Sequence, residues 1–190
     1  DTVYAKPISS FGICINEIYS SGPVNNIFYF YDQYLELYNS SDSVKYLDGI
    51  MVMRVSGNND GKGPGADEYE DGNIHGVTYA FRFPGKPGEK NHPIQPGQFI
   101  VLAQDAVNHR NMVSTSFDLS NADWEFYNQF SANDIDNPNV PNLINMKPEH
   151  TTDFFINLIS DRIVISNGRD TVWTDGLRID TVIDGVEYQA

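Results

Sequence analysis

Three side chains near the middle of the chain have types and spacing that suit a carbohydrate site. Trp124 and Tyr127 are three positions apart, and Asn128 follows directly. Sugar rings stack on flat aromatic side chains and exchange hydrogen bonds with amides. Because positions i and i+3 of a helix share a face, a helix here would present Trp124, Tyr127 and Asn128 together. The competing interpretation is that this face packs against the rest of the protein, since a short helix must bury one side to be stable. Tyr29 and Tyr31, on a predicted strand, are further aromatic candidates.

Two other groups of side chains have chemistry that could ligate a metal ion. Asp105 and His109 are four positions apart and would lie on one face of a helix. Two ligands are too few for zinc, and the helix dipole by itself favours an acid near a helix start and a histidine near its end. Residues 60–71 carry five carboxylates in a glycine-rich segment, which would suit calcium. That segment lacks EF-hand spacing, and a solvated loop is the stronger interpretation. We therefore predict no metal site and no cofactor.

Catalytic signatures are missing from the sequence. It contains no G-x-S-x-G, P-loop or G-x-G-x-x-G stretch. An enzyme would require residues distant in sequence to converge in a pocket, for example His109 or His150 with Asp134 or Asp136. The single cysteine, Cys14, lies in a predicted strand and is expected to pack as a small apolar group. We therefore predict no catalytic residues, and an enzyme with an unrecognised site remains only the second alternative.

The charge balance excludes two classes of partner. The chain has 12 Lys+Arg against 26 Asp+Glu, a net charge of −14 and a pI near 4.4. A phosphate backbone or an anionic membrane surface would be repelled, and the basic residues form no stripe. No apolar run is long enough to span a membrane, and the sequence shows no signal-peptide pattern. We expect no nucleic-acid partner and no membrane span. A secretion signal or lipid anchor would lie upstream of Asp1.

The elements that would position these side chains are short strands separated by Gly, Pro and Asn turns, a pattern typical of an all-β sandwich. Apolar and aromatic runs predict strands at 15–19, 27–38, 50–55, 77–83, 99–103, 154–158, 162–165 and 182–188, with a weaker one at 172–174. Pro96-Gly97 predicts a tight turn before the strand at 99–103. Residues 104–150 differ from this pattern and are interpreted as a helical and loop insertion, with short helices near 104–110 and 120–127. A chain of 190 residues suits one domain, 1–190, that contains this insertion.

The order of several short motifs resembles that of the lamin-tail domain, an immunoglobulin-like β-sandwich. The matching segments are Ile15-Asn16-Glu17-Ile18-Tyr19, Tyr34-Leu35-Glu36-Leu37-Tyr38-Asn39, Leu47-Asp48-Gly49, Phe83-Pro84, Pro96-Gly97-Gln98-Phe99-Ile100-Val101-Leu102 and Asp180-Thr181-Val182-Ile183-Asp184-Gly185-Val186-Glu187-Tyr188. The resemblance implies an all-β, immunoglobulin-like β-sandwich of lamin-tail type, with the insertion at about 104–150. Lamin-tail domains usually continue to a further strand after the one at 182–188, so the resemblance implies a trimmed or disordered C-terminus that lacks this last strand.

The insertion resembles a bacterial family of secreted proteins, the domain of unknown function 4876, built on a lamin-tail-like fold. The motifs that carry this likeness are V-L-A-Q-D-A-V-N-H, S-F-D-L-S-N-A-D-W-E-F-Y, D-I-D-N-P-N-V-P-N and V-I-D-G-V-E-Y. The resemblance implies an extracellular, cell-surface or periplasmic location, as the outer part of a lipoprotein, and no particular activity. We expect a non-catalytic secreted or cell-surface module for adhesion, assembly or protein interaction. Its partner would be a protein or a glycan of the cell envelope, and the alternative is a carbohydrate-binding module using the aromatic residues of the insertion.

Overall fold

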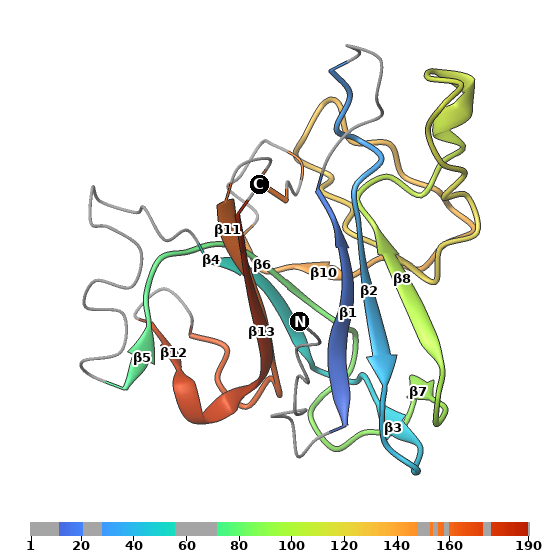
Figure 1. Ribbon diagram of the computed structural model, residues 1–190. Helices are drawn as coiled ribbons and strands as arrows, with labels where there is room; N and C mark the ends of the chain where they lie inside the picture. Colours follow the sequence, from blue (N-terminus) through green and yellow to red (C-terminus); the bar gives the residue numbers. More distant parts are fainter. Residues whose placement is uncertain are drawn as a thin grey trace, which may run out of the picture.

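Two β-sheets form the framework of the protein (Figure 1). The computed structural model describes residues 12–20, 28–55, 72–147, 153, 156–157, 160–172 and 176–189. The first sheet has the order β1-β2-β8-β9, with β1 at Ile13–Tyr19, β2 at Tyr34–Asn39, β8 at Phe99–Ala103 and β9 at Trp124–Glu125. The second has the order β10-β6-β4-β11-β13, with β10 at Ile144–Asn145, β6 at Val77–Arg82, β4 at Met51–Val55, β11 at Ser160–Ser166 and β13 at Val182–Gln189. Neighbouring strands are antiparallel except β8 and β9, which are parallel.

Two short ribbons and two 3-10 turns complete the regular structure of the described residues. Strand β5 (Asn73–Ile74) pairs with β12 (Leu177–Arg178), and β3 (Lys45–Tyr46) pairs with β7 (Pro93–Ile94). The 3-10 turns are η2 at His109–Asn111 and η4 at Ile179–Thr181. Turn η2 and residues 28–33 lie at the upper end of the molecule in Figure 1, and the β3–β7 ribbon lies at the lower end.

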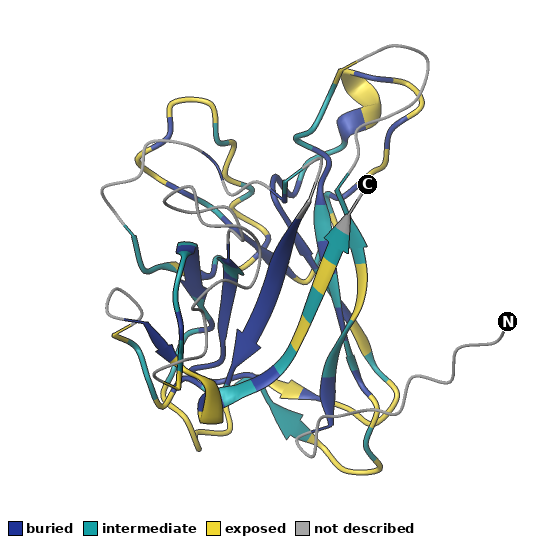
Figure 2. Ribbon diagram, turned by 60° about the vertical axis from the view of Figure 1, so that its left-hand side comes forward, coloured by how far each residue is buried: buried dark blue, intermediate teal, exposed yellow. Residues whose placement is uncertain are grey.

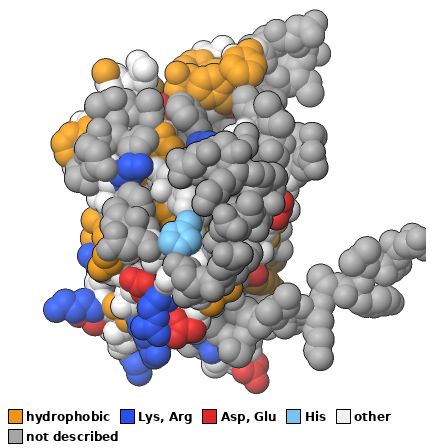
Figure 3. All heavy atoms as spheres, turned by 90° about the vertical axis from the view of Figure 1, so that its left-hand side faces the viewer, with side chains coloured by type: hydrophobic (Ala, Val, Ile, Leu, Met, Phe, Trp, Pro, Cys, Tyr) orange, Lys and Arg blue, Asp and Glu red, His pale blue; other side chains and the backbone are white. Residues whose placement is uncertain are grey.

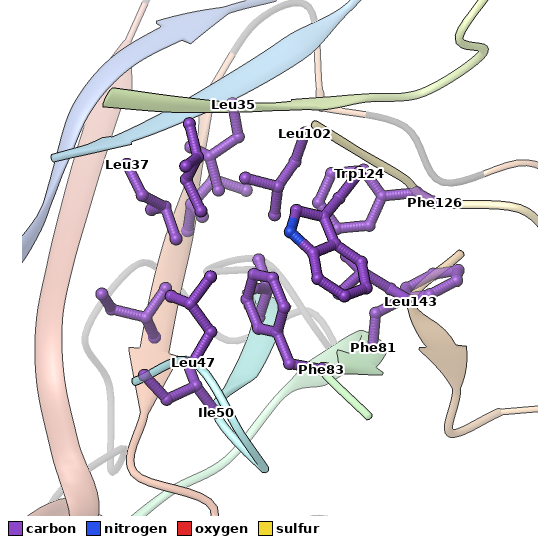
Figure 4. Packing of buried hydrophobic residues seen from close by; sticks show 14 of the residues in the cluster. Leu35, Leu37, Leu47, Ile50, Phe81, Phe83, Leu102, Trp124, Phe126 and Leu143 are labelled. Atoms are coloured by element: carbon purple, nitrogen blue, oxygen red, sulfur yellow. The ribbon is translucent and has the colours of Figure 1, made fainter. Parts of the chain in front are cut away.

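The main hydrophobic core lies between the two sheets. Leu35 and Leu37 of β2 face Phe81 of β6 and Ile163 of β11, because alternate residues of a strand point to the same side. Figure 4 shows the aromatic part of this core, in which the rings of Phe83 and Trp124 meet edge to face at 5.0 Å. Burial of this many apolar side chains is the main force that holds the two sheets together.

The second sheet is buried on its outer face as well. Met51 and Met53 of β4 and Val164 of β11 form a separate apolar cluster with Ile74 of β5 and Leu177 of β12. The β5–β12 ribbon therefore covers this face, which explains why β4 reads Met-Val-Met without alternating polar residues. In Figure 2 the central strands of this sheet are dark blue, whereas β13, at its edge, is largely teal and yellow.

The all-β prediction is confirmed, and most of the expected strands occur within one or two residues of their predicted bounds. The tight turn at Pro96-Gly97 is also present, since the N–H of Gln98 donates to the carbonyl of Gln95 at 3.0 Å and Gly97 has a φ of +72°. The long run 27–38 was predicted as one strand, but β2 begins only at Tyr34, after a turn at 31–32. The strands expected at 154–158 and 172–174 fall largely outside the described residues, and 156–157 are not in a strand.

The helical character predicted for the insertion is not confirmed. Residues 104–147 contain the 3-10 turn η2, the two-residue strands β9 and β10, and turns, but no α-helix. The backbone of this region is held by polar side chains instead, as described below. None of the helices in the described residues is long and apolar enough to cross a membrane.

Candidate functional site

The three predicted sugar-binding residues do not share an exposed face. Trp124 is only 7% exposed and packs in the core against Phe83 and against the ring of His92, 5.1 Å away. Asn128 is buried, and its side-chain oxygen accepts hydrogen bonds from the N–H of Phe130 and the amide of Asn145. Tyr127 is half-buried. The i, i+3 argument fails because Trp124 belongs to strand β9 and not to a helix.

Buried carboxylates hold the backbone of the insertion in place. The Glu125 side chain, with no exposed surface, accepts hydrogen bonds from the backbone N–H groups of Ala106 (2.5 Å) and Asn137 (3.0 Å). Asp134 accepts one from the N–H of Asn128 at 2.9 Å. These bonds join residues that are 19, 12 and 6 positions apart in the chain, without a helix or a long strand between them. Such charge-assisted bonds to backbone groups are among the stronger hydrogen bonds in proteins.

Four carboxyl groups lie close enough in this region to influence one another. Burial raises the pKa of Asp105 to about 8, and the neighbouring Asp134 carboxylate adds to the effect. Burial likewise raises the pKa of Asp134 to about 7, with further contributions from Asp153 and Glu125. Like charges in a buried site cannot all ionise together, so Asp105 and Asp134 hold protons at pH values where an exposed aspartate has lost its own. Asp105, Glu125 and Asp153 of this cluster are buried, and Asp134 is half-buried.

A second buried polar group, next to η2, fixes the loop 28–33 against the insertion. The Tyr29 hydroxyl lies 2.7 Å from Nδ1 of His109, whose Nε2 lies 2.9 Å from the carbonyl oxygen of Asp105. Since a carbonyl can only accept, the proton of His109 sits on Nε2 and Tyr29 donates to Nδ1. Burial lowers the pKa of His109, in keeping with a neutral ring. Nearby, the buried carboxylate of Asp32 accepts a hydrogen bond from the hydroxyl of Ser116.

Aromatic side chains cover the surface above this polar group. We call this surface the aromatic end. It consists of Tyr19, Phe28, Tyr29, Phe30, Tyr31, Tyr34, Met112 and Phe117. Phe28 is 77% exposed and Met112 54% exposed. Figure 3 shows hydrophobic side chains gathered at this upper end of the molecule.

The rings of the aromatic end contact one another in two groups. Phe28 meets Phe30 edge to face at 5.1 Å, and Phe30 stacks on Tyr31 at 4.8 Å. Tyr19 stacks on Tyr34 at 5.4 Å and meets Phe117 edge to face at 4.9 Å. Burial raises the pKa of both Tyr19 and Tyr29, and the negative charge of Asp32 adds to this effect at each tyrosine.

Sequence reasoning overlooked Phe28 and Phe30 as candidate surface residues. It placed Phe28 to Tyr31 in one long strand, 27–38, with apolar or aromatic side chains on both faces and with the insertion covering part of the outer face. The signal that was available is the polar pair Asp32-Gln33, which interrupts the aromatic run. Both residues are buried, and Gln33 exchanges hydrogen bonds with the backbone of Ile156. The chain turns there, and the aromatic residues before the turn extend beyond the sheet.

The residues predicted as possible metal ligands or catalytic groups do not come together as a site in the described residues. Asp105 and His109 are connected through the Asp105 carbonyl rather than through its carboxylate, and both ring nitrogens of His109 are occupied. Asp136 is exposed and accepts a hydrogen bond from the Asn142 side chain. His150 and the acidic segment 60–71 lie outside the described residues. Within the described ranges, no three or more His, Cys, Asp or Glu side chains are arranged to hold a metal ion.

Comparison with known proteins agrees with the sequence motifs. Residues 95–188 match the sequence profile of a family described as protein of unknown function (DUF4876). A crystal structure of a DUF4876 family protein from Bacteroides thetaiotaomicron VPI-5482 has the same fold, with a TM-score of 0.75 and 23% sequence identity. The fold thus defines an all-β protein of two packed sheets. The profile match over residues 95–188 agrees with the resemblance to the DUF4876 family that the sequence motifs indicate.

The likeness covers 93% of this chain but 53% of the Bacteroides protein, so this chain spans about half the length of that protein. At this level of identity the solved structure indicates the fold alone. A search of curated proteins finds no match.

Proposed function

We propose that this chain is a non-catalytic secreted or cell-surface module for adhesion, assembly or protein interaction, and that the aromatic end contacts its partner. The observation that carries this proposal is the exposure of Phe28, 77%, within a connected group of aromatic rings. Contiguous apolar surface is costly in water and is typical of binding sites. Aromatic residues are also enriched at the centres of protein interfaces.

The polar group beneath the aromatic end supports this proposal. Tyr29 is held by His109, and Asp32 is held by Ser116, so the loop that carries Phe28 and Phe30 is tied to the insertion at two points. A surface that is already ordered loses less conformational entropy on binding than a mobile one. The insertion therefore has a role in this proposal, which is to support the contact surface from below.

The finer description of the fold belongs to the same proposal. We infer an immunoglobulin-like sandwich of lamin-tail type, based on the order of the L-E-L-Y-N, L-D-G and C-terminal D-G-V-E-Y motifs on strands of two facing sheets. The location would be the cell surface, the periplasm or the extracellular space. In the Bacteroides protein the matching region is part of a longer chain, in agreement with a module that is joined to other domains.

Binding to the envelope of the source cells tests the proposal. A Phe28→Ser/Phe30→Ser variant should lose at least about tenfold in affinity for an envelope fraction, equivalent to about 1.4 kcal/mol. Phe99→Ser is the matched control, because Phe99 is 48% exposed and stacks on Tyr38 of β2, a residue outside the aromatic end. Equal binding by the double variant and the wild type would exclude the aromatic end as the contact surface.

A glycan partner is the second candidate, and the exposed ring of Phe28 together with the half-buried Tyr31 favours it over the original group at Trp124. A glycan array should then give a signal that Phe28→Ser removes. Trp124→Ala should instead lower stability, because Trp124 is a core residue. An array without signal at tens of micromolar protein would eliminate this candidate.

A further inference from the structure

The end of the molecule opposite the aromatic end contains a cavity of about 410 Å³. Three loops form it: the segment from Val44 to Ile50, the loop from Pro87 to Lys90, and the turn that carries Asn167 and Arg169. Cavities of roughly 300–1,000 Å³ are the usual size of small-molecule sites. The lining combines the apolar side chains of Ile50 and Tyr46 with several charged groups.

Two tight turns shape the first two loops. The N–H of Ile50 donates to the carbonyl of Leu47 at 2.9 Å, and Gly49 has a φ of +77°. In the same way the N–H of Glu89 donates to the carbonyl of Lys86 at 3.0 Å, with Gly88 at a φ of +93°. Both have the pattern of type II turns, which require a left-handed residue at the third position. The turn at Leu47-Asp48-Gly49 therefore brings Asp48 and Ile50 to the wall of the cavity.

Close backbone contacts bring the three loops together. A Cβ atom on Gly168 would lie 1.8 Å from the carbonyl oxygen of Gly49, and one on Gly49 would lie 2.6 Å from Cδ of Pro87. Glycine is required at both positions, because any side chain would force the loops apart. The cavity is therefore formed by packed backbone, and its walls are ordered before any ligand arrives.

The two carboxylates of the cavity are already used by the protein. Asp48, 3% exposed, accepts hydrogen bonds from the N–H groups of Asn91 and His92 and from the Asn91 side chain. Burial alone would raise its pKa, but these bonds together lower it, so Asp48 is an ionised anchor for the loop. Glu89 accepts hydrogen bonds from the N–H of Lys86 and from Asn91. Among the described residues, neither Asp48 nor Glu89 forms an ion pair with a basic side chain of the cavity.

Basic side chains also surround the cavity. Lys45, Lys90 and Arg169 line it, which is three of the 12 basic residues in a chain of net charge −14. The Lys90 ammonium lies 5.7 Å from the centre of the Tyr46 ring. Across the described ranges, neither Lys90 nor Arg169 forms an ion pair with a carboxylate. Both are exposed, so their charges are available to a ligand.

We propose that this cavity binds a small oxyanion, carried either by a free polycarboxylate or phosphate or by an acidic sugar unit of a glycan. Lys90 and Arg169 would contact the anionic group, and Tyr46 with Ile50 would contact its apolar part. A guanidinium can hold a carboxylate or phosphate through two parallel hydrogen bonds. This site is distinct from the aromatic end and does not depend on the function proposed for that surface.

Nuclear magnetic resonance titration tests the proposal with three probes: citrate, inorganic phosphate and a trimer of galacturonic acid. The experiment is run on the full chain at about 150 mM salt, where the Debye length is about 8 Å and the repulsion from the overall negative charge is screened. We expect saturable shifts of the backbone amides of Tyr46, Gly88, Lys90 and Arg169 with at least one probe. Preference for the trimer over citrate and phosphate would identify a glycan as the source of the anion, and the reverse preference a free metabolite.

Matched variants make the test specific. Lys90→Ala and Arg169→Gln should each weaken binding about tenfold, equivalent to about 1.4 kcal/mol. Arg178→Ala changes the net charge equally but removes a cation that pairs with Asp180 and does not line the cavity, so binding should be unchanged. The proposal is wrong if none of the three probes gives saturable shifts at probe concentrations up to about 20 mM. This concentration would nearly saturate a site with a Kd of about 2 mM. The proposal is also wrong if all three variants weaken binding equally.

Discussion

The aromatic end and the cavity at the opposite end of the molecule differ in where their charged side chains lie. Beneath the aromatic end the carboxylate of Asp32 is buried, and the surface itself is aromatic. In the insertion that supports this end, the carboxylates of Asp105 and Glu125 are buried as well. At the cavity end, one carboxylate, Asp48, is buried, while basic side chains stand around an open space. Figure 3 shows this contrast on one face, with hydrophobic side chains at the top and charged side chains of both signs at the bottom.

Both ends nevertheless use buried carboxylates for the same purpose. Glu125 accepts hydrogen bonds from two backbone N–H groups of the insertion, and Asp48 accepts them from two successive residues of the 85–92 loop. A buried backbone N–H must find a partner, and a carboxylate can satisfy two such groups at once. At both ends, therefore, buried carboxylates stabilise the backbone, and other side chains are exposed to a ligand. These exposed side chains are aromatic rings at the aromatic end and cations at the cavity.

The largest effect should come from breaking the loop contact at the cavity end. Gly168→Ala places a Cβ atom 1.8 Å from the Gly49 carbonyl, and we expect a loss of about 3–5 kcal/mol in the free energy of unfolding. Gly97→Ala is the control, since Gly97 has a similar φ but no atom within 4 Å of the added Cβ. It should cost only the left-handed strain of about 1–2 kcal/mol. Urea unfolding measures both, and equal losses would show that the close contact at Gly168 is not rigid.

A smaller effect should follow from changing the carboxylate that organises the insertion. Glu125→Gln keeps the shape but replaces one accepting oxygen with a donating amide, so the N–H of Ala106 or Asn137 loses its partner. We expect a loss of about 1–3 kcal/mol in the free energy of unfolding, the cost of one buried unsatisfied group. Glu36→Gln, on a half-buried strand residue that accepts only from the exposed side chain of Asn16, should change stability by less than about 0.5 kcal/mol.

Two acids of the insertion, the buried Asp105 and the half-buried Asp134, should also make the free energy of unfolding depend on pH. The folded state holds protons on Asp105 and Asp134, with pKa values of about 8 and 7, that the unfolded state has released above about pH 4. Because the folded state binds more protons in this window, stability is fully present at low pH and falls as pH rises from about 4 to 8. Urea midpoints measured at pH 5, 7 and 9 should therefore decrease.

Asp105→Asn should reduce this slope, because it removes one of the two protonated acids. Asp42→Asn changes the net charge equally at an exposed position and should leave the slope as in the wild type. Identical slopes in the two variants would mean that the pH dependence comes from the overall negative charge and not from the buried pair.

The parts of the fold that local pattern determines were predictable from the sequence. Strand β8 and the turn at Pro96-Gly97 follow from alternation and from proline and glycine chemistry within a few residues. The insertion was not predictable in this way. A capping pattern predicted a short helix at 120–127, but the backbone there is fixed by contacts such as that between Glu125 and Ala106, 19 positions apart. No local window contains such a contact.

The candidate sites show the same limit. The Leu47-Asp48-Gly49 motif was found as a marker of the fold, but its role in the cavity depends on Gly168, which comes from a distant part of the chain. Likewise, the exposure of Phe28 depends on the turn at 31–32 and on Asp32 and Gln33, whose side chains form hydrogen bonds with Ser116 and Ile156. Sequence patterns located the residues, and only the tertiary contacts assign them to a surface.

The smallest effect on stability should come from the cations of the cavity. Lys90 and Arg169 are exposed, and the ring contact of Lys90 with Tyr46 is worth little in water. We expect Lys90→Ala and Arg169→Gln each to change the free energy of unfolding by less than about 0.5 kcal/mol. Thermal and urea unfolding would measure this. Substitution of Asp48 by Asn at the same end should instead destabilise the protein, because Asp48 holds the 85–92 loop. If Lys90→Ala and Arg169→Gln lowered the free energy of unfolding as much as Asp48→Asn, the two cations would be needed to stabilise the fold. They could not then be assigned to ligand binding alone.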